Sequence, residues 1–286
     1  MSNKPSFIAK IVERLLMLNK PSYMDSKEEV IEFLDEKSEY DNRPVKSFFS
    51  SFDFDGRQVF KFGDEKSKNL IVYIHGGAYI NELNMQHLLF CKLLSVILHS
   101  YVLVPVYPLA PLHKVNETFD FITRLYGKYI NQDYNITLMG DSAGGGFVLS
   151  FCQYLNQINL AQPRNIIVFS PWVDISMSNP PYDNENDPIL GEVGLKEIGK
   201  SWASNLDMKD YRVSPVYGDN HNLSKTLIFA GENEIFFKDI SKYVDNLKKD
   251  DVNVKFIVGE KLFHIYPLFP IPEVISTLKI IKKEMK

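Results

Sequence analysis

The stretch 136–146, Ile-Thr-Leu-Met-Gly-Asp-Ser-Ala-Gly-Gly-Gly, constrains the fold of this chain more than any other. Gly140 and Gly144 flank Ser142 between a short apolar run and a segment that can be helical. This pattern predicts a strand that turns sharply into a helix, with the serine in a strained backbone conformation at the turn. The flanking residues must be small, because a Cβ atom at either glycine would collide with the neighbouring strand or helix. The serine hydroxyl would then project from the sheet beside a helix N-terminus, which favours negative charge.

Short apolar runs alternate with helical patterns along most of the chain. Buried strands are predicted at 69–74, 101–106, 136–139, 165–169, 225–230 and 253–258. Helices are predicted at 84–98, 115–130, 239–249 and 272–283. This alternation predicts a mostly parallel sheet with helices on both faces. The Asp55-Gly56 turn, between alternating apolar residues, predicts a β-hairpin before the first buried strand.

Two helical patterns precede the sheet, at residues 5–20 and 26–35. Ser26 is the expected N-cap of the second helix, and Glu29 stands three residues further on, as in a capping box. Such helices usually pack on a core, but their position before the first strand also allows a lid over a pocket. We therefore treat residues 1–45 as N-terminal cap helices.

Residues 176–218 lack strong periodicity apart from one helical pattern at 195–205. They contain proline and glycine, and we interpret them as an insertion over the end of the sheet that contributes to the cap. No internal repeat or interdomain linker is recognisable. The chain is therefore predicted to have one main domain, residues 46–286, covered in part by helical cap elements.

Composition gives no sign of several classes of partner. The net charge is −4 without a long basic block, so neither nucleic acid nor an anionic membrane is expected as a partner. Cys91 and Cys152 are the two cysteines, and both lie in apolar segments typical of buried thiols. Charged residues interrupt the apolar N-terminal stretch, and no apolar run approaches the roughly 20 residues that span a bilayer. We expect a soluble, cytoplasmic protein without integral membrane association.

The carboxyl ends of the predicted strands carry a set of reactive residue types. In an open parallel sheet these ends converge on one crevice, which would bring together Gly76, Gly77, Ser142, Glu234 and His264. A serine hydroxyl is a poor nucleophile until a base takes its proton, and a histidine can take that proton and return it. A carboxylate orients the imidazole, and backbone N–H groups stabilise an oxyanion. The order serine, acid, histidine is typical of one fold.

Five segments carry a family resemblance. Residues 75–78 read His-Gly-Gly-Ala, 107–111 Tyr-Pro-Leu-Ala-Pro, 140–145 Gly-Asp-Ser-Ala-Gly-Gly, 170–176 Ser-Pro-Trp-Val-Asp-Ile-Ser, and 214–219 Ser-Pro-Val-Tyr-Gly-Asp. They resemble motifs of the hormone-sensitive-lipase-like branch of α/β-hydrolases, a group of carboxylesterases and lipases; the first departs from the HGGG signature only at its last residue. The resemblance implies an α/β-hydrolase fold, with a mostly parallel central sheet, helices on both faces and a helical cap.

The resemblance also implies roles for individual residues. Ser142 would be the nucleophile and His264 the general base. The backbone N–H groups of Gly76, Gly77 and Ala143 would form the oxyanion hole. No metal and no organic cofactor would be needed, and no pair among the other histidines has metal-ligand spacing.

The remaining motif residues have supporting roles, and the triad acid departs from the family pattern. His75 would orient the oxyanion loop, and Asp141 would support the serine turn. The family usually places an aspartate where this chain has Glu234. Glu232 and Asp239 are alternatives; Asp239 is better explained as an N-cap, and Glu232 lies nearer the strand end, where its side chain is harder to aim.

The sequence therefore predicts a serine carboxylester hydrolase that acts through an acyl-enzyme. Short acyl chains in soluble esters are favoured, because no exposed apolar surface for lipid droplets is recognisable. A deacetylase or amidase with the same triad remains an alternative, as does a non-catalytic small-molecule-binding protein on this fold. A homodimer is possible by family analogy.

A few other residues near the predicted crevice have two interpretations. Tyr79, Phe147 and Trp172 either line an acyl pocket or belong to the core. Asp174 and Asp187 are interpreted as residues that hold loops, with substrate contact as the alternative.

Overall fold

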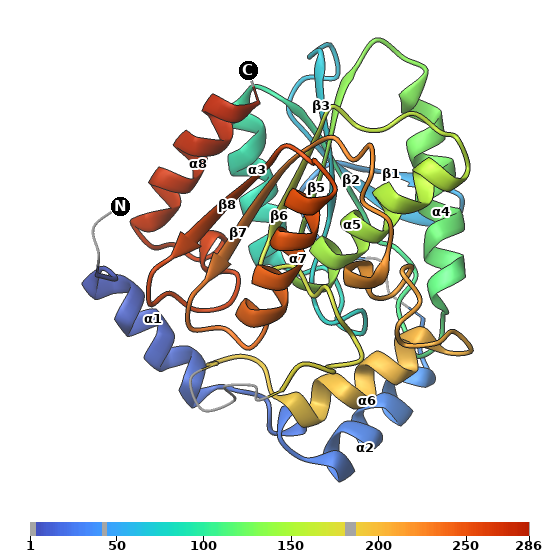
Figure 1. Ribbon diagram of the computed structural model, residues 1–286. Coiled ribbons are helices and arrows are strands. Elements are labelled where there is room, and N and C mark those ends of the chain that lie inside the picture. Colours follow the sequence, from blue (N-terminus) through green and yellow to red (C-terminus); the bar gives the residue numbers. More distant parts are fainter. Residues whose placement is uncertain (1–3, 42–44, 181–186, 286) are drawn as a thin grey trace.

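An eight-stranded, mostly parallel sheet forms the centre of the molecule (Figure 1). The computed structural model describes residues 4–41, 45–180 and 187–285. The strands are β1 (Ser51–Phe54), β2 (Arg57–Phe62), β3 (Asn69–Ile74), β4 (Tyr101–Pro105), β5 (Asn135–Asp141), β6 (Asn165–Phe169), β7 (Lys225–Gly231) and β8 (Val254–Gly259). Their order is β1-β2-β4-β3-β5-β6-β7-β8, and only the β1–β2 and β2–β4 pairs are antiparallel. The predicted α/β-hydrolase sheet is confirmed, including the hairpin.

The parallel strands distribute their side chains between two apolar cores, as the period-two geometry of a strand requires. On β3, Leu70, Val72 and Ile74 belong to one core, whereas Ile71 and Tyr73 belong to the other. Helices on the first face are α4 (Val115–Ile130), α5 (Ser142–Gln157) and α7 (Phe237–Lys249), and on the second face α3 (Met85–Leu98) and α8 (Glu273–Glu284). This two-sided burial explains why the strands read as continuous apolar runs.

The N-terminal segment lies beyond the end of the sheet, close to the inserted segment (Figure 1). The elements concerned are α1 (Phe7–Leu18), the short 3₁₀ helix η1 (Ser22–Met24), α2 (Lys27–Ser38) and α6 (Glu192–Ala203). Both η1 and α2 pack on α6. Two further 3₁₀ helices are η2 (Pro215–Tyr217) and η3 (Tyr266–Leu268).

A glycine allows the N-terminal segment to approach α6 closely. A Cβ atom at Gly194 would lie 2.7 Å from the Met24 Cα atom and 2.8 Å from the Tyr23 carbonyl oxygen. Both distances are shorter than real Cβ contacts, so any side chain there would push η1 away from α6. Only glycine at position 194 therefore allows η1 to pack this closely on α6.

Helix α1 has apolar side chains on two opposite sides. Ala9, Val12 and Leu16 face the second core. On the other side, large apolar side chains are exposed to solvent: Phe7, Ile8, Ile11, Leu15 and Leu18. The expectation that the chain lacks an exposed apolar surface is therefore wrong, and with it the reason for favouring soluble short-chain esters. Among the described residues, no helix is long and apolar enough to cross a membrane.

The structure confirms one predicted helix start and corrects another. The Ser26 hydroxyl accepts a hydrogen bond from the Glu29 N–H and caps α2, as expected. Asp239, by contrast, is not the N-cap of α7: the helix begins at Phe237, and Phe236 occupies the cap position. Asp239 lies buried in the first turn, where its carboxylate accepts a hydrogen bond from the Asn179 side chain at 3.1 Å. A carboxylate in the first turn still interacts favourably with the helix dipole.

The three aromatic residues that the sequence allows either in an acyl pocket or in the core are buried in the core. Tyr79, Phe147 and Trp172 are each about 1% exposed. The Tyr79 ring stacks on Trp202 of α6 with a centroid distance of 4.1 Å and an interplanar angle of 2°. The aromatic layer thus joins the loop after β3 to the inserted segment.

Replacement of Gly194 by alanine should lower the free energy of unfolding, although alanine is the better helix former by about 1 kcal/mol. The new Cβ atom would meet the backbone of Tyr23 and Met24. Gly127→Ala in α4 is the matched control, because a Cβ atom there would meet nothing within 4 Å, and it should raise stability by about 0.5–1 kcal/mol. Urea titration followed by circular dichroism measures both; stabilisation by both substitutions would contradict the close η1–α6 contact.

Candidate active site

The serine turn has the geometry that the glycine pattern predicts. Strand β5 ends at Asp141, α5 begins at Ser142, and Ser142 has φ +52°, in the left-handed region that L-residues rarely adopt. A Cβ atom at Gly144 would lie 2.1 Å from the Ile74 carbonyl oxygen, and one at Gly140 only 2.6 Å from the Gly144 oxygen. The turn can therefore form only with glycine at both positions.

His264 lies within hydrogen-bonding distance of the serine. Its Nε2 atom is 2.9 Å from the Ser142 Oγ atom, although 122 residues separate the two in sequence. His264 stands on the loop between β8 and η3, and both side chains are buried. The structure thus brings together the predicted nucleophile and base, with the imidazole aimed at the hydroxyl proton.

Glu234 lies on the other side of the imidazole. Its Oε1 atom is 3.8 Å from His264 Nδ1, which is too long for a hydrogen bond. Neither atom has another hydrogen-bond partner among the described residues, and both are buried. The Oε2 atom accepts hydrogen bonds from the Ser170 hydroxyl at 2.6 Å and the Gly231 N–H at 2.9 Å. Glu234 is therefore held by one oxygen while the other faces the imidazole.

The two alternative acids have other partners. Glu232 is exposed, and its Oε2 atom accepts a hydrogen bond from the Lys261 N–H at 2.9 Å, which ties together the loops after β7 and β8. Asp239 is occupied by the Asn179 side chain. Of the three carboxylates, Glu234 is the one that the structure places against His264.

The acidic surroundings of His264 raise its pKa. Burial alone would lower the pKa, because it penalises the charged imidazolium. Glu234 acts in the opposite direction, followed by Asp187 and Asp141, and the net result is a pKa above the ordinary value of 6.5. The imidazolium that forms when the histidine takes a proton is thus stabilised by the surrounding carboxylates.

Two further residues support the site, and the sequence gives no signal for the contacts of one of them, Ser170. The Ser170 hydroxyl donates to Glu234 and accepts a hydrogen bond from the Ile265 N–H at 2.9 Å, so it connects the acid loop to the histidine loop. The Asp187 carboxylate accepts hydrogen bonds from the N–H groups of Leu190 and Ile235 at 2.8 and 2.9 Å. Asp187 therefore holds loops together, as expected, and it also places negative charge near His264.

The oxyanion loop differs from the prediction at one residue. The Gly76 N–H donates a hydrogen bond to the Asp141 Oδ1 atom at 3.0 Å, so it is not available to a substrate oxygen. Gly77 and Ala78 instead line the pocket beside Ser142. In the described part of the chain, the N–H groups of Gly77, Ala78 and Ala143 have no hydrogen-bond acceptor. Among the described residues, Ala78, which the motif pattern does not indicate as a donor, thus has an unpaired N–H group beside Ser142, whereas Gly76 does not.

The buried Asp141 carboxylate connects the serine turn to this loop. Its Oδ1 atom also accepts a hydrogen bond from the Tyr73 hydroxyl at 2.7 Å, and its Oδ2 atom lies 3.4 Å from His87 Nε2. Burial would raise the pKa of Asp141, but His87, Tyr73 and His75 outweigh that effect and lower it. Asp141 therefore remains ionised and holds the Gly76 backbone in place.

His75 is a neutral, fully buried residue of the same loop. Its Nδ1 atom lies 2.6 Å from the Gly76 carbonyl oxygen, and its ring lies 4.5 Å from that of Tyr107. Burial lowers the pKa of His75 to about 3, so Nδ1 can carry the proton that it donates to the carbonyl. These contacts fit the structural role that the resemblance implies.

A pocket of about 530 Å³ opens at Ser142 and His264. Its wall is formed in part by Tyr23 and Met24 of η1 and by Leu190 of the inserted segment. Residues of the N-terminal segment and of the insertion thus meet above the serine. Among the described residues, no group of three or more His, Cys, Asp or Glu side chains is arranged to hold a metal ion.

A serine on a strained strand-to-helix turn, with a histidine and a carboxylate on later loops of the same sheet edge, defines a serine hydrolase architecture. The chain belongs to the alpha/beta hydrolase fold family, whose model matches residues 71–268. It is 28% identical over 207 residues to an esterase from Acinetobacter venetianus, a match that covers 70% of this chain and 68% of the relative. These similarities indicate a carboxylesterase-type hydrolase.

Solved structures agree with this assignment. The crystal structure of a candidate esterase from Staphylococcus aureus has a TM-score of 0.85 and 26% identity, over 91% of this chain and 93% of that one. A hormone-sensitive lipase from a metagenome library has a TM-score of 0.82 and 21% identity, over 97% of each chain, and shows the same fold. The resemblance to the hormone-sensitive-lipase-like branch is therefore confirmed.

An NMR titration should give a pKa above 6.5 for the His264 imidazole, because the nearby carboxylates outweigh burial. Glu234→Gln should lower this pKa, since burial remains while the largest opposing charge is removed. Glu232→Gln is the matched control and should leave the value unchanged, because Glu232 points to the Lys261 backbone. A wild-type value below 6.5, or no response to Glu234→Gln, would contradict the electrostatic description.

Ser170→Ala should reduce kcat on a p-nitrophenyl ester. The substitution removes a donor from Glu234 and leaves the Ile265 N–H without its acceptor. Such a loss is worth about 1–3 kcal/mol, which corresponds to roughly 5- to 150-fold in rate. Ser176→Ala, whose hydroxyl bonds to Asp174 instead, should have little effect on kcat. Equal kcat values for both variants would show that Ser170 does not position the acid.

Proposed function

We propose that this protein is a serine carboxylester hydrolase that acts through an acyl-enzyme, with Ser142 as the nucleophile. The observation that carries the proposal is the 2.9 Å distance between His264 Nε2 and Ser142 Oγ at the floor of an accessible pocket. A base at this distance can take the hydroxyl proton as the serine attacks an ester carbonyl. The chemistry then needs an orienting acid and an oxyanion site.

In the proposed mechanism, Glu234 orients His264 and stabilises the imidazolium. Its free Oε1 atom faces Nδ1 at 3.8 Å, and catalytic hydrogen bonds are often long in the absence of substrate and tighten when it binds. His264 then protonates the departing alcohol. Water repeats the sequence in the second half of the reaction and releases the acid.

The proposed oxyanion donors are the N–H groups of Gly77, Ala78 and Ala143. Gly77, Ala78 and Tyr79 all have positive φ values, and a tightly turned backbone can gather N–H groups into an anion-binding concavity. Ala143 lies in the first turn of α5, where the helix leaves its N–H group unpaired. Removing one donor of this kind costs about 3 kcal/mol in comparable enzymes.

The proposed substrate is a carboxylic ester whose acyl and alcohol parts share the pocket beside Ser142. Its volume of about 530 Å³ lies within the usual range of roughly 300–1,000 Å³ for small-molecule sites. We also propose that residues 1–45 and 176–218 act as the cap. The support for this is the contribution of η1 and Leu190 to the pocket wall.

Hydrolysis of p-nitrophenyl esters of increasing acyl length tests the proposal. Ser142→Ala should abolish turnover, and Glu234→Gln should lower kcat by roughly 10²- to 10⁴-fold, because the imidazole loses its orienting charge. Glu232→Gln, the same change two positions away, should retain near-normal kcat because its carboxylate faces Lys261.

Fluorophosphonate labelling separates an inactive hydrolase from a binding protein, since only an activated serine reacts. Wild type should be labelled at Ser142, and Ser142→Ala should not. A folded wild type that is neither labelled nor active on any ester would refute the proposed function. Normal activity of Glu234→Gln would refute only the assignment of the acid.

A further inference from the structure

The exposed side of α1 forms a continuous apolar stripe. Phe7, Ile11 and Leu15 follow at intervals of four residues, and Ile8 and Leu18 lie beside them at intervals of three or four. Residues at these intervals share one face of a helix. Their exposure ranges from 42% for Ile11 to 82% for Leu18, which is unusual for five large apolar side chains on one face of a helix.

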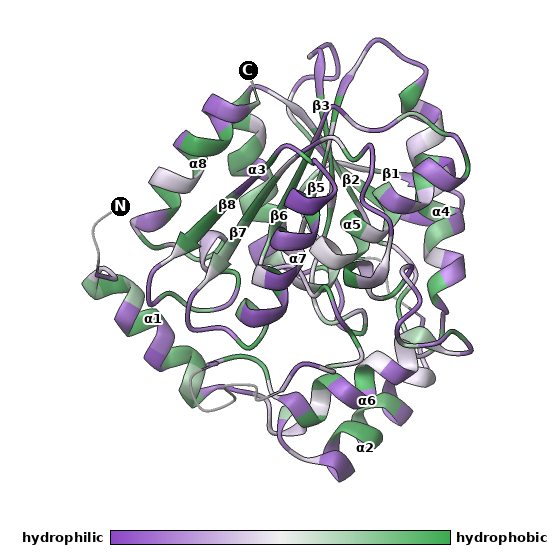
Figure 2. Ribbon diagram, viewed as in Figure 1, coloured by the Kyte–Doolittle hydropathy of each residue, from purple (hydrophilic) through white to green (hydrophobic). Residues whose placement is uncertain are grey.

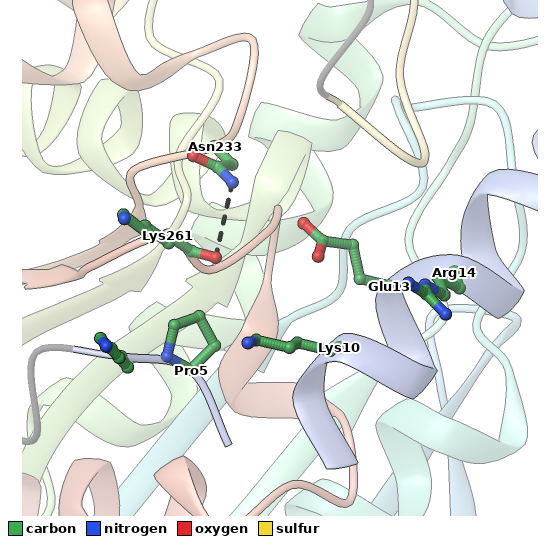
Figure 3. A pocket seen from close by; sticks show the side chains of 7 residues that line it. Pro5, Lys10, Glu13, Arg14, Asn233 and Lys261 are labelled. Atoms are coloured by element: carbon green, nitrogen blue, oxygen red, sulfur yellow. Dashed lines mark hydrogen bonds between the residues drawn. The ribbon is translucent and has the colours of Figure 1, made fainter. Parts of the chain in front are cut away.

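The opposite side of α1 is anchored to the body of the protein. The Glu273 carboxylate accepts hydrogen bonds from the Ser6 N–H at 2.6 Å and from the Ser6 hydroxyl at 3.1 Å. Ala9 is buried, and Figure 3 shows the Glu13 carboxylate directed toward Asn233, which precedes Glu234. The helix thus has a fixed orientation, with the apolar stripe directed away from the protein.

Cationic side chains gather along one flank of the stripe. Lys10 and Arg14 of α1 border a pocket of about 440 Å³, together with Lys4 and Lys261 (Figure 3). Glu13 is the only acidic side chain among the described residues that line it, and Figure 3 shows it directed toward Asn233. Four cations around one carboxylate stand out in a chain with a net charge of −4. Figure 2 shows the alternation of hydrophobic and hydrophilic residues along α1.

We propose that α1 docks this protein peripherally on an anionic lipid surface. The apolar stripe would lie at the level of the acyl chains, while Lys10, Arg14 and Lys261 meet the headgroups. An amphipathic helix with large apolar residues on one face and flanking cations is typical of interfacial binding. A symmetric contact with a second copy fits less well, because it would bring the same cations toward each other.

The C-terminal end of the stripe is close in sequence to residues that form the wall of the active-site pocket. The stripe ends at Leu18, and Tyr23 and Met24, a few residues further on, form part of the pocket wall. In the part of the chain that the structure describes, no α1 side chain lines that pocket. If the proposed esterase activity holds, on which this step rests, docking through α1 would place the pocket entrance beside the lipid surface that supplies amphiphilic esters.

Vesicle co-sedimentation tests the docking independently of catalysis. Wild type and Ser142→Ala should bind vesicles of phosphatidylcholine with phosphatidylserine equally, and bind pure phosphatidylcholine more weakly. Ile11→Gln with Leu15→Gln should reduce the partition coefficient at least roughly tenfold. Lys10→Gln with Arg14→Gln should reduce it roughly fivefold per charge, an effect that added salt should reproduce.

Val96→Gln with Ile275→Gln is the matched control, because these apolar side chains are 55% and 60% exposed but lie on α3 and α8. It should bind vesicles like wild type, and all α1 variants should hydrolyse dissolved p-nitrophenyl acetate normally. Two results would overturn the proposal: wild type that binds no vesicles, or binding that the α1 substitutions leave unchanged. A wild-type dimer that Ile11→Gln with Leu15→Gln converts to monomer would assign the stripe to a second copy instead. Wild type that binds vesicles but hydrolyses no ester would refute only the esterase function.

Discussion

The close backbone approach at the serine turn is the constraint on which the rest of the site depends. The carbonyl oxygens of Ile74 and His75 occupy the space that a side chain at Gly144 would need. Strand β3, the start of α5 and the oxyanion loop therefore touch one another through backbone atoms, which cannot adjust as side chains do. This contact keeps Ser142 in its left-handed conformation, at a conformational cost of about 1–2 kcal/mol that the packed sheet offsets.

Hydrogen bonds to two buried carboxylates hold the loops around this turn in place. Asp141 is buried and ionised, and it fixes the Gly76 backbone, while the Ser170 hydroxyl joins Glu234 to the histidine loop. A buried carboxylate is tolerable only when donors surround it, and here those donors are parts of the site itself. Gly76 and Ser170, which donate hydrogen bonds to Asp141 and Glu234, therefore belong to the loop that carries the oxyanion N–H groups and contact the histidine loop, respectively.

The fold, the strands and the cluster of Ser142, Glu234 and His264 can be predicted from the sequence, because each depends on local periodicity or on the convergence of strand ends. Roles that depend on a distant partner cannot be predicted in this way. The motif pattern indicates Gly76 as an oxyanion donor, because the bond of Gly76 to Asp141, 65 residues away, leaves no local signal. The contacts of Ser170 with Glu234 and Ile265 leave no local signal either. Periodicity also could not reveal that α1 buries only one of its two apolar sides.

The stacking of Tyr79 on Trp202 has a mechanical consequence. Tyr79 directly follows Ala78, and its ring lies flat against α6 of the inserted segment. Its carbonyl oxygen also accepts a hydrogen bond from the Ala110 N–H at 2.9 Å. A displacement of α6 would therefore act on the peptide units of Gly77 and Ala78 through one rigid ring. The position of α6 therefore determines how well the N–H groups beside the serine are aligned.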